Sequence, residues 1–154
     1  MEKIPRIIFL FFFIVSANTI SASEIQLDEA DFLDIKHIVL QPFFTALKNG
    51  NVLIIKDYLS EDFYSSYQTL LERNEGYPQF LRDYYRGVEF YPINAVQKDD
   101  TVEVNVEITS PDGTISHMEL NLKKSVNKEP GEINQGRWKI DRKFKKTKGT
   151  ADTK

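Results

Sequence analysis

The sequence predicts an α+β domain in which three to four N-terminal helices pack on a curved, four-stranded antiparallel sheet. Three observations support this fold class. Apolar residues of the first half recur every three or four positions, as on the buried face of a helix. From Val88 onward they recur at every second position, as in half-buried strands. The chain has 154 residues, 41% of them hydrophobic and none of them cysteine, which is enough for one core without disulfides.

The N-terminal residues 1–23 have the pattern of a secretory signal peptide. Lys3 and Arg6 form a positive start, Ile7–Val15 is an unbroken apolar run, and Ser21–Ser23 supplies small residues at a cleavage site. A membrane span needs ~20 apolar residues, and this run is far shorter. We therefore expect a periplasmic or secreted mature protein with no stable membrane anchor.

Charge divides the chain into an acidic body and a basic tail. Residues 24–136 hold 10 Lys and Arg against 20 Asp and Glu, whereas residues 137–154 hold 8 against 2. An acidic domain does not offer the basic face that nucleic acid requires, so no nucleic-acid partner is expected. We predict one domain over residues 24–144, followed by a disordered basic tail over residues 145–154.

The first predicted helix is amphipathic and has a suitable N-cap in Asp28. Pro42 lies within its pattern, so the helix should kink there or restart with Pro42 in its first turn. The segment Asn49–Asn51 contains a glycine and should end it. The residues of its apolar stripe are Phe32, Leu33, Ile35, Val39, Leu40, Phe43, Phe44, Ala46 and Leu47.

Shorter helices should follow this one. The second is predicted over Val52–Tyr58, and Ser60 should cap the third, which Asn74–Gly76 ends. Pro78 should open a further short helix that stops at Gly87.

Four segments are predicted to form the sheet. Thr101–Thr109 alternates valine with polar residues and is the clearest half-buried strand. A Pro-Asp-Gly turn joins it to Thr114–Lys123. The strand Val88–Gln97 contains Pro92 and should therefore lie at an edge or carry a bulge. Arg137–Phe144 should form the last strand, with Trp138 facing inward.

Two segments resemble the nuclear transport factor 2-like superfamily, in particular its small exported members. They are Pro42–Ser66 (PFFTALKNGNVLIIKDYLSEDFYSS) and Gly136–Asp141 (GRWKID), and the likeness in element order extends over residues 35–144. The resemblance implies a cone of helices closed by a curved sheet around a pocket. That fold includes isomerases, dehydratases, cyclases and members without known chemistry, so it does not by itself imply an activity.

Tyrosine is concentrated in one part of the chain, since all seven tyrosines lie between Tyr58 and Tyr91. Tyrosine has an apolar body and a polar tip, which suits a pocket lining, although core packing would also explain the cluster. Strict alternation turns Arg142 inward, where it could bind an anionic ligand or pair with Glu89, or instead extend to solvent. The predicted ligand-binding residues are Tyr64, Tyr67, Tyr84, Tyr85 and Arg142.

No motif for catalysis, metal or cofactor binding is found. The sequence lacks a nucleophile elbow, a phosphate-binding loop, a dinucleotide fingerprint and an EF-hand loop. His37 and His117 lie far apart in the chain, and the spacing of Asp28, Asp31 and Asp34 is explained by a helix dipole. We therefore assign no catalytic residue, metal or cofactor.

Three functions are consistent with these patterns. The first is an exported domain that binds a small molecule or a partner protein without catalysis, with an outward sheet face that is solvated or forms a homodimer. The second is an isomerase or hydrolyase with Tyr64, Tyr67 or Tyr84 as proton donor and a base among Asp57, Asp62 and Asp83. The third is an accessory component of an envelope or secretion assembly. The residues of the outward face are Glu103, Asn105, Glu107, His117, Glu119 and Asn121.

Overall fold

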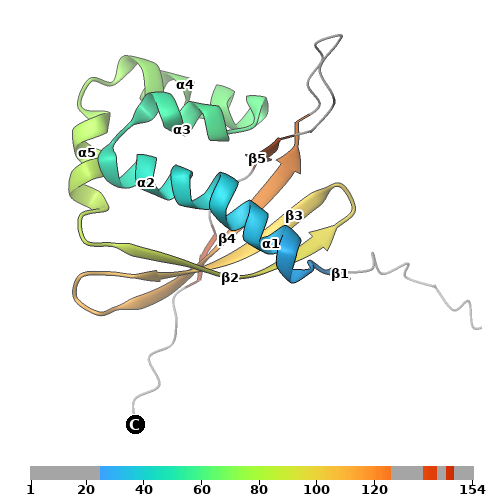
Figure 1. Ribbon diagram of the computed structural model, residues 1–154. Helices are drawn as coiled ribbons and strands as arrows, with labels where there is room; N and C mark the ends of the chain where they lie inside the picture. The colour runs from blue at the N-terminus through green and yellow to red at the C-terminus, as the bar shows by residue number, and fades with distance from the viewer. Residues whose placement is uncertain (1–24, 126–136, 142–144, 148–154) are drawn as a thin grey trace, which may run out of the picture.

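The computed structural model describes residues 25–125, 137–141 and 145–147, the last of these as backbone only. The predicted signal peptide, most of the predicted tail and Arg142 lie outside the described residues. Within them the chain is α+β, as predicted, with the helices on one face of an antiparallel sheet (Figure 1).

The helices occupy the first half of the domain. A long helical stretch crosses the sheet, and three shorter helices pack beside and beyond it (Figure 1). Their bounds are α1 Glu29–Ile35, η1 Lys36–Leu40, α2 Gln41–Asn49, α3 Val52–Tyr58, α4 Glu61–Arg73 and α5 Tyr77–Tyr84.

The segment η1 is a π-helical turn that joins α1 to α2 without a break. The Gln41 N–H donates to the Lys36 carbonyl, five residues back. Pro42 lies in the first turn of α2. Proline has no N–H, and its ring would clash with the carbonyl four residues back, so a widened turn before it lets the helix continue. Of the two predicted alternatives, a kink or a restart, Pro42 matches the second in that it lies in the first turn of an α-helix, although that helix continues directly from η1.

The predicted caps are also confirmed. The Asp28 carboxylate accepts a hydrogen bond from the Asp31 N–H (2.8 Å), and the Ser60 hydroxyl accepts one from the Phe63 N–H (3.2 Å). These side chains satisfy N–H groups that a helix leaves unpaired at its start, which is why α1 and α4 begin where the sequence indicates.

Gly50 ends α2 in the left-handed conformation, with φ of 61°. A Cβ atom at this position would lie 2.1 Å from the carbonyl oxygen of Pro78 in α5. Glycine is therefore required both for the backbone conformation and for the close approach of α5 to the end of α2.

The sheet has six strands, so the prediction of four strands was wrong. The strands β1 to β5 follow one another in order across the sheet, and β6 pairs with β4 beside β5. β1 and β6 are too short to show a periodic pattern in sequence. The strands are β1 Ile25–Gln26, β2 Glu89–Lys98, β3 Thr101–Thr109, β4 Ile115–Lys124, β5 Trp138–Ile140 and β6 Lys145–Thr147.

Two predicted boundaries differ from the structure. The last predicted strand, Arg137–Phe144, is described as the shorter β5, with residues 142–144 outside the described residues. Lys145–Thr147, assigned from sequence to the tail, pair with β4. In β2, where Pro92 predicts an edge position or a bulge, the register shifts between Pro92 and Asn94.

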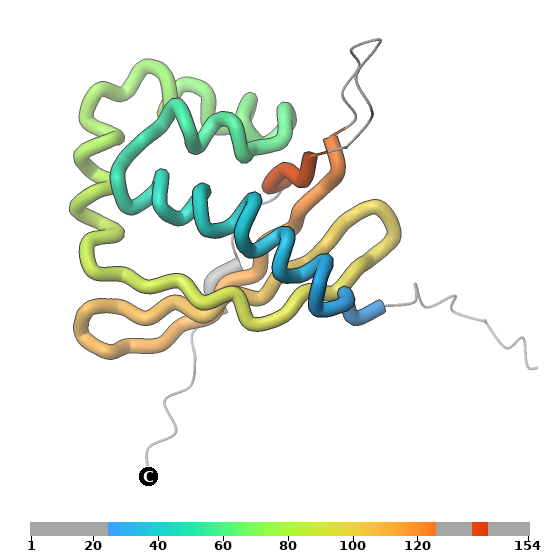
Figure 2. The backbone as a smooth tube through the Cα atoms, viewed as in Figure 1, coloured from blue at the N-terminus to red at the C-terminus, as the bar shows by residue number. Residues whose placement is uncertain are grey.

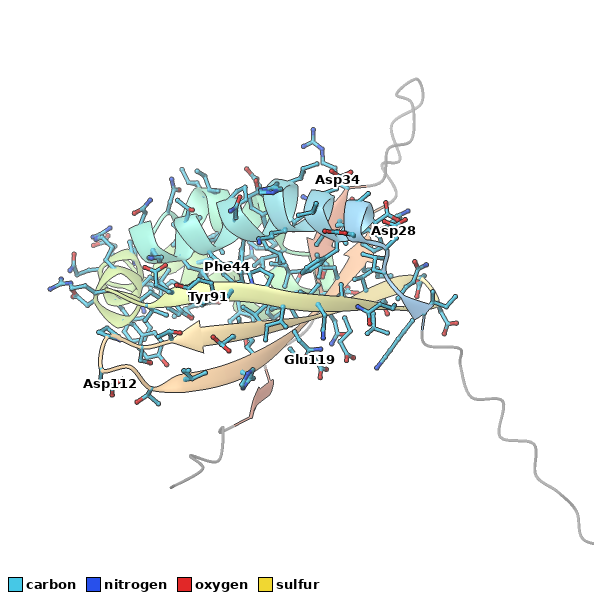
Figure 3. The ribbon with its side chains drawn as sticks, turned by 60° about the horizontal axis from the view of Figure 1, so that its bottom comes forward. Asp28, Asp34, Phe44, Tyr91, Asp112 and Glu119 are labelled. Atoms are coloured by element: carbon cyan, nitrogen blue, oxygen red, sulfur yellow. The ribbon has the colours of Figure 1, made fainter. Side chains whose placement is uncertain are left out.

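The two faces of the sheet have the predicted character. Val102, Val104 and Val106 of β3 are fully buried under the helices, as are Leu120 and Leu122 of β4. The six polar residues predicted to face outward are exposed or half-buried. Figure 3 shows Glu119 on the side of the sheet opposite the helices, whereas Phe44 lies between α2 and the sheet.

β5 brings the end of the described chain back to the helices. The Ser60 N–H, just after α3, donates to the Ile140 carbonyl (2.8 Å), and Leu59 forms a parallel bridge with Ile140. Figure 2 shows β5, in red, beside the green end of α3. Residues some eighty positions apart therefore meet at this point.

Candidate ligand-binding cavity

A cavity of about 660 Å³ lies where α1, η1 and the end of α3 converge with β5 and the end of β4. Seven of its lining residues are apolar or aromatic and most of the others are charged. The lining residues are Leu27, Asp31, Asp34, Ile35, Ile38, Val39, Ile54, Asp57, Tyr58, Gln97, Lys124, Arg137, Trp138 and Lys139.

The apolar part of the lining extends from the core to the surface. Ile35 and Val39 are buried at 2% and 4% exposure, whereas Ile38 and Ile54 are 65% and 41% exposed. Leu27, Tyr58 and the half-buried Trp138 complete this part. The cavity is thus open to solvent at one side and bounded by core residues at the other.

The acidic lining residues come from helices. Asp31 and Asp34 lie three positions apart on α1 and so share one helix face. Asp57 lies near the end of α3. All three are exposed, and none forms an ion pair within the part of the chain that the structure describes. Figure 3 shows Asp34 on the same helical stretch as Asp28, away from Phe44 and Tyr91.

The basic lining residues come from the sheet. Lys124 ends β4, and its Nζ lies 5.0 Å from the centre of the Trp138 ring, the residue opposite it in the pairing of β4 with β5. Arg137 and Lys139 flank Trp138 and, two positions apart, share one side of the strand. The cation–π contact positions Lys124 beside the aromatic part of the lining.

Lys139 is the most enclosed cation of the cavity. Its ammonium donates a hydrogen bond to the backbone carbonyl of Asp57. Burial lowers the pKa of Lys139, an effect that the carboxylate of Asp57 opposes and the charge of Arg137 reinforces. A half-buried positive charge therefore lies in the wall of the cavity, and another cation lies close to it.

The four tyrosines predicted to bind a ligand do not line this cavity. The Tyr64 hydroxyl donates to Glu72, which also accepts a hydrogen bond from Lys56 (2.8 Å). Tyr67 packs edge-on against Phe63, with ring centres 5.1 Å apart. Both tyrosines therefore make their contacts within α4, and Lys56 links the Tyr64–Glu72 pair to α3.

The other two predicted tyrosines belong to a continuous row of aromatic rings. Tyr84 and Tyr85 are in edge-on contact, with ring centres 4.9 Å apart, and Tyr85 packs against Phe90 at 5.6 Å. Burial, with a smaller effect of Tyr84, raises the pKa of Tyr85 to about 12. Tyr84 is 58% exposed, and Tyr85 serves mainly to connect α5 with β2.

Arg142, the fifth predicted residue, lies outside the described residues. Glu89, considered from sequence as its partner, forms an ion pair with Lys48 (3.1 Å).

The sequence did not identify Lys124, Arg137 and Lys139 as site residues. Lys139 alternates with the apolar residues of β5, a pattern that predicts a solvent-facing side chain. It lines the cavity because α3 passes beside β5, an arrangement that no local pattern encodes. Trp138 was the available signal, because a tryptophan among cations at a strand end often packs with them.

No group of three or more His, Cys, Asp or Glu that could hold a metal ion occurs among the described residues. None of the helices in the described ranges is long and apolar enough to span a membrane.

Comparison with known proteins identifies no family. No family model matches the sequence, and no curated protein matches it. The chain is similar to the solution NMR structure of a de novo β-sheet design protein, with 18% identity and a TM-score of 0.39 over 80% of this chain and 95% of that chain. This similarity is too weak to support any inference about fold family or function.

Proposed function

We propose that this protein is an exported binding domain of the nuclear transport factor 2-like type, whose ligand is a small molecule bound in the cavity between α1, α3 and β5. The cavity is the observation that carries the proposal. Its volume of about 660 Å³ lies within the ~300–1,000 Å³ that small-molecule sites usually occupy. Its lining combines an apolar and aromatic part with charged groups that could orient a ligand, and small-molecule sites also combine these two kinds of lining.

Two features support the proposed cone-like fold. The helices all cover one face of the sheet, and the register of β2 shifts between Pro92 and Asn94, the kind of irregularity at which strands bend. The space between the helices and the far end of the sheet is the cavity. The proposal of export rests on the signal-peptide pattern of residues 1–23 and is tested by an intact mass that begins at Glu24 in a periplasmic or secreted fraction.

Binding in the cavity is tested with Nile red, an uncharged apolar dye that fluoresces when it leaves water. We expect saturable binding to the protein. Ile54 lines the cavity and is 41% exposed, so Ile54→Trp should fill part of the cavity without disturbing the core and should weaken dye binding. Leu53→Trp is the matched control, since Leu53 is its neighbour on α3, is 72% exposed and does not line the cavity.

Equal loss of dye binding in both variants would indicate binding elsewhere on the surface. No saturable binding to the wild-type protein would contradict a small-molecule site in this cavity.

An isomerase or hydrolyase is the second candidate, because Asp57 and Tyr58 bring a carboxylate and a phenol to the cavity wall. Asp57 is exposed, however, and the described residues include no buried carboxylate, whereas a general base gains its raised pKa from burial. This favours binding over catalysis. Turnover of β,γ-unsaturated ketones that is abolished in Asp57→Asn, with Nile red binding unchanged, would establish the enzyme instead.

A second copy of the chain is the proposed partner for the outward sheet face. This face is polar in the centre, but Tyr91 and Ile115 on it are 52% and 50% exposed. Sedimentation equilibrium should show a dimer that Ile115→Glu dissociates and that Leu53→Glu, on the helical side, leaves intact. A monomer at all concentrations would contradict this contact.

A further inference from the structure

We infer that the cavity selects an amphipathic monocarboxylate, with the carboxylate at Lys139 and Arg137 and the apolar body against Ile35, Val39 and Trp138. This inference rests on the proposed binding function and specifies the chemistry of its ligand.

Two cations lie close together in the wall of the cavity. Arg137 and Lys139 lie on the same side of β5 and line the cavity, and neither forms an ion pair among the described residues. Lys124 pairs with Trp138 and therefore lies on the other side of the strand. Arg137 is close enough to Lys139 to disfavour its charge. The Asp57 carboxylate only partly offsets the effects of burial and of Arg137 on the charge of Lys139, so an anion placed between the two cations would stabilise both.

The different burial of the acidic and basic side chains favours an anionic over a cationic ligand. Asp31, Asp34 and Asp57 are exposed and can be hydrated, whereas Lys139 is half-buried. Burial is the largest influence on the Lys139 pKa and lowers it, while Asp57 opposes this effect only in part. A bound carboxylate would offset the lost hydration of the ammonium, so the free energy gained is larger for an anion than for a cation.

The remaining lining residues define the rest of the ligand. Ile35 and Val39 form a buried apolar wall, and Trp138 lies beside the cations. The exposed carboxylates on α1 and α3 line the same cavity and would repel a second negative charge on the ligand. An apolar body that bears one carboxylate meets both conditions, whereas a phosphate ester or a dicarboxylate does not.

Three probes with the same ten-carbon chain test this inference: decanoate, decan-1-ol and decylamine, with affinities measured by calorimetry at low salt. Decanoate should bind about tenfold more tightly than decan-1-ol, and decylamine no more tightly than decan-1-ol. Equal affinities for decanoate and decan-1-ol, or tightest binding of decylamine, would overturn the inference. Saturable binding of decan-1-ol would show at the same time that the cavity binds apolar molecules, so the proposed function would stand.

A matched pair of variants tests whether Lys139 binds the carboxylate of decanoate. Lys139→Met should lower the affinity for decanoate about tenfold and leave that for decan-1-ol unchanged. Lys123→Met is the control, because Lys123 pairs with Lys139 across β4 and β5 but is exposed and does not line the cavity. Equal effects of the two substitutions would mean that the preference for decanoate over decan-1-ol comes from general surface charge. That result would overturn the assignment of the carboxylate to the cavity.

Should Lys139→Met unfold the protein, Arg137→Gln replaces it, since Arg137 is exposed. This substitution should lower the affinity for decanoate several-fold more than the affinity for decan-1-ol. An equal effect on the two affinities would contradict the inference.

Discussion

The two ends of the helical layer differ in how they use the space above the sheet. At the end where α5, α2 and the start of β2 meet, aromatic rings fill it. Phe44 and Phe90 stack in parallel planes with ring centres 4.3 Å apart, and the row continues through Tyr85 and Tyr84 to Phe80. At the other end, where α1, α3 and β5 meet, a cavity of about 660 Å³ remains.

This difference shows that a concentration of tyrosines does not by itself locate a pocket. Large rings close a space when several of them come from neighbouring elements, because each one packs against the next. The cavity lies where single residues of different types converge from distant parts of the chain. Phe90 and Gln97, at opposite ends of β2, belong to these two regions.

The largest expected effect is on the free energy of unfolding, which should fall much more for a substitution at the aromatic end than for one at the cavity end. Phe44→Ala should lower the free energy of unfolding by ~3–5 kcal/mol, because Phe44 is buried at 5% exposure and stacks on Phe90. Ile54→Ala, at the cavity, should cost less than ~1 kcal/mol because its side chain is 41% exposed. Urea denaturation measures both. Similar losses would mean that the cavity end is as tightly packed as the aromatic end.

The next effect tests the contact of α2 with α5. Gly50→Ala should lower stability by at least ~2 kcal/mol, since it combines a left-handed backbone with a Cβ atom 2.1 Å from the Pro78 carbonyl. Gly113→Ala is the control. Gly113 also has positive φ, of 81°, but nothing lies within 4 Å of an added Cβ, so only the backbone cost of ~1–2 kcal/mol should remain. Equal losses would show that the close approach to Pro78 carries no cost.

A smaller effect concerns Glu72, the partner of Tyr64. Hydrogen bonds from Lys56, Tyr64 and Gln68 lower the pKa of Glu72 to about 2. In the unfolded chain its pKa returns to the ordinary value of 4.5, so the unfolded state binds the proton first as the pH falls. The stabilisation is complete above pH 4.5 and is lost as the pH falls toward 2.

Glu72→Gln should therefore flatten the acid limb of the stability curve between those pH values. Denaturant unfolding at several pH values measures this. An unchanged slope would contradict the hydrogen-bonded network. Because Glu72 is exposed, the difference should also shrink in high salt.

The smallest expected effect is on binding. Tyr64→Phe and Tyr85→Phe should leave the affinity for Nile red unchanged, because neither residue lines the cavity. Tyr58→Phe removes the hydroxyl of a tyrosine that does line it and is the comparison variant. Weaker dye binding in the first two variants alone would place the site at the tyrosine-rich end and reverse the contrast between the two regions.

Local sequence patterns predicted most of the helices and strands and which face of each is buried. Period, caps and breakers are local properties, so the amphipathic helix after Asp28, the cap at Ser60, the end at Gly50 and the irregularity of β2 at Pro92 could all be predicted. The short strands β1 and β6 could not be predicted, since two or three residues form a strand only when a neighbouring edge is available for pairing.

The position of the cavity and the side chains that line it depend on how distant elements pack together. The wall that joins Asp57 to Lys139 exists because the end of α3 contacts β5, where the Ser60 N–H donates to the Ile140 carbonyl. Local patterns specify which face of an element is buried. They do not specify which distant element covers that face or whether the covering side chains fill the space. The tyrosines at the end of α5 fill the space between the helices and the sheet, whereas the residues around Trp138 leave a cavity.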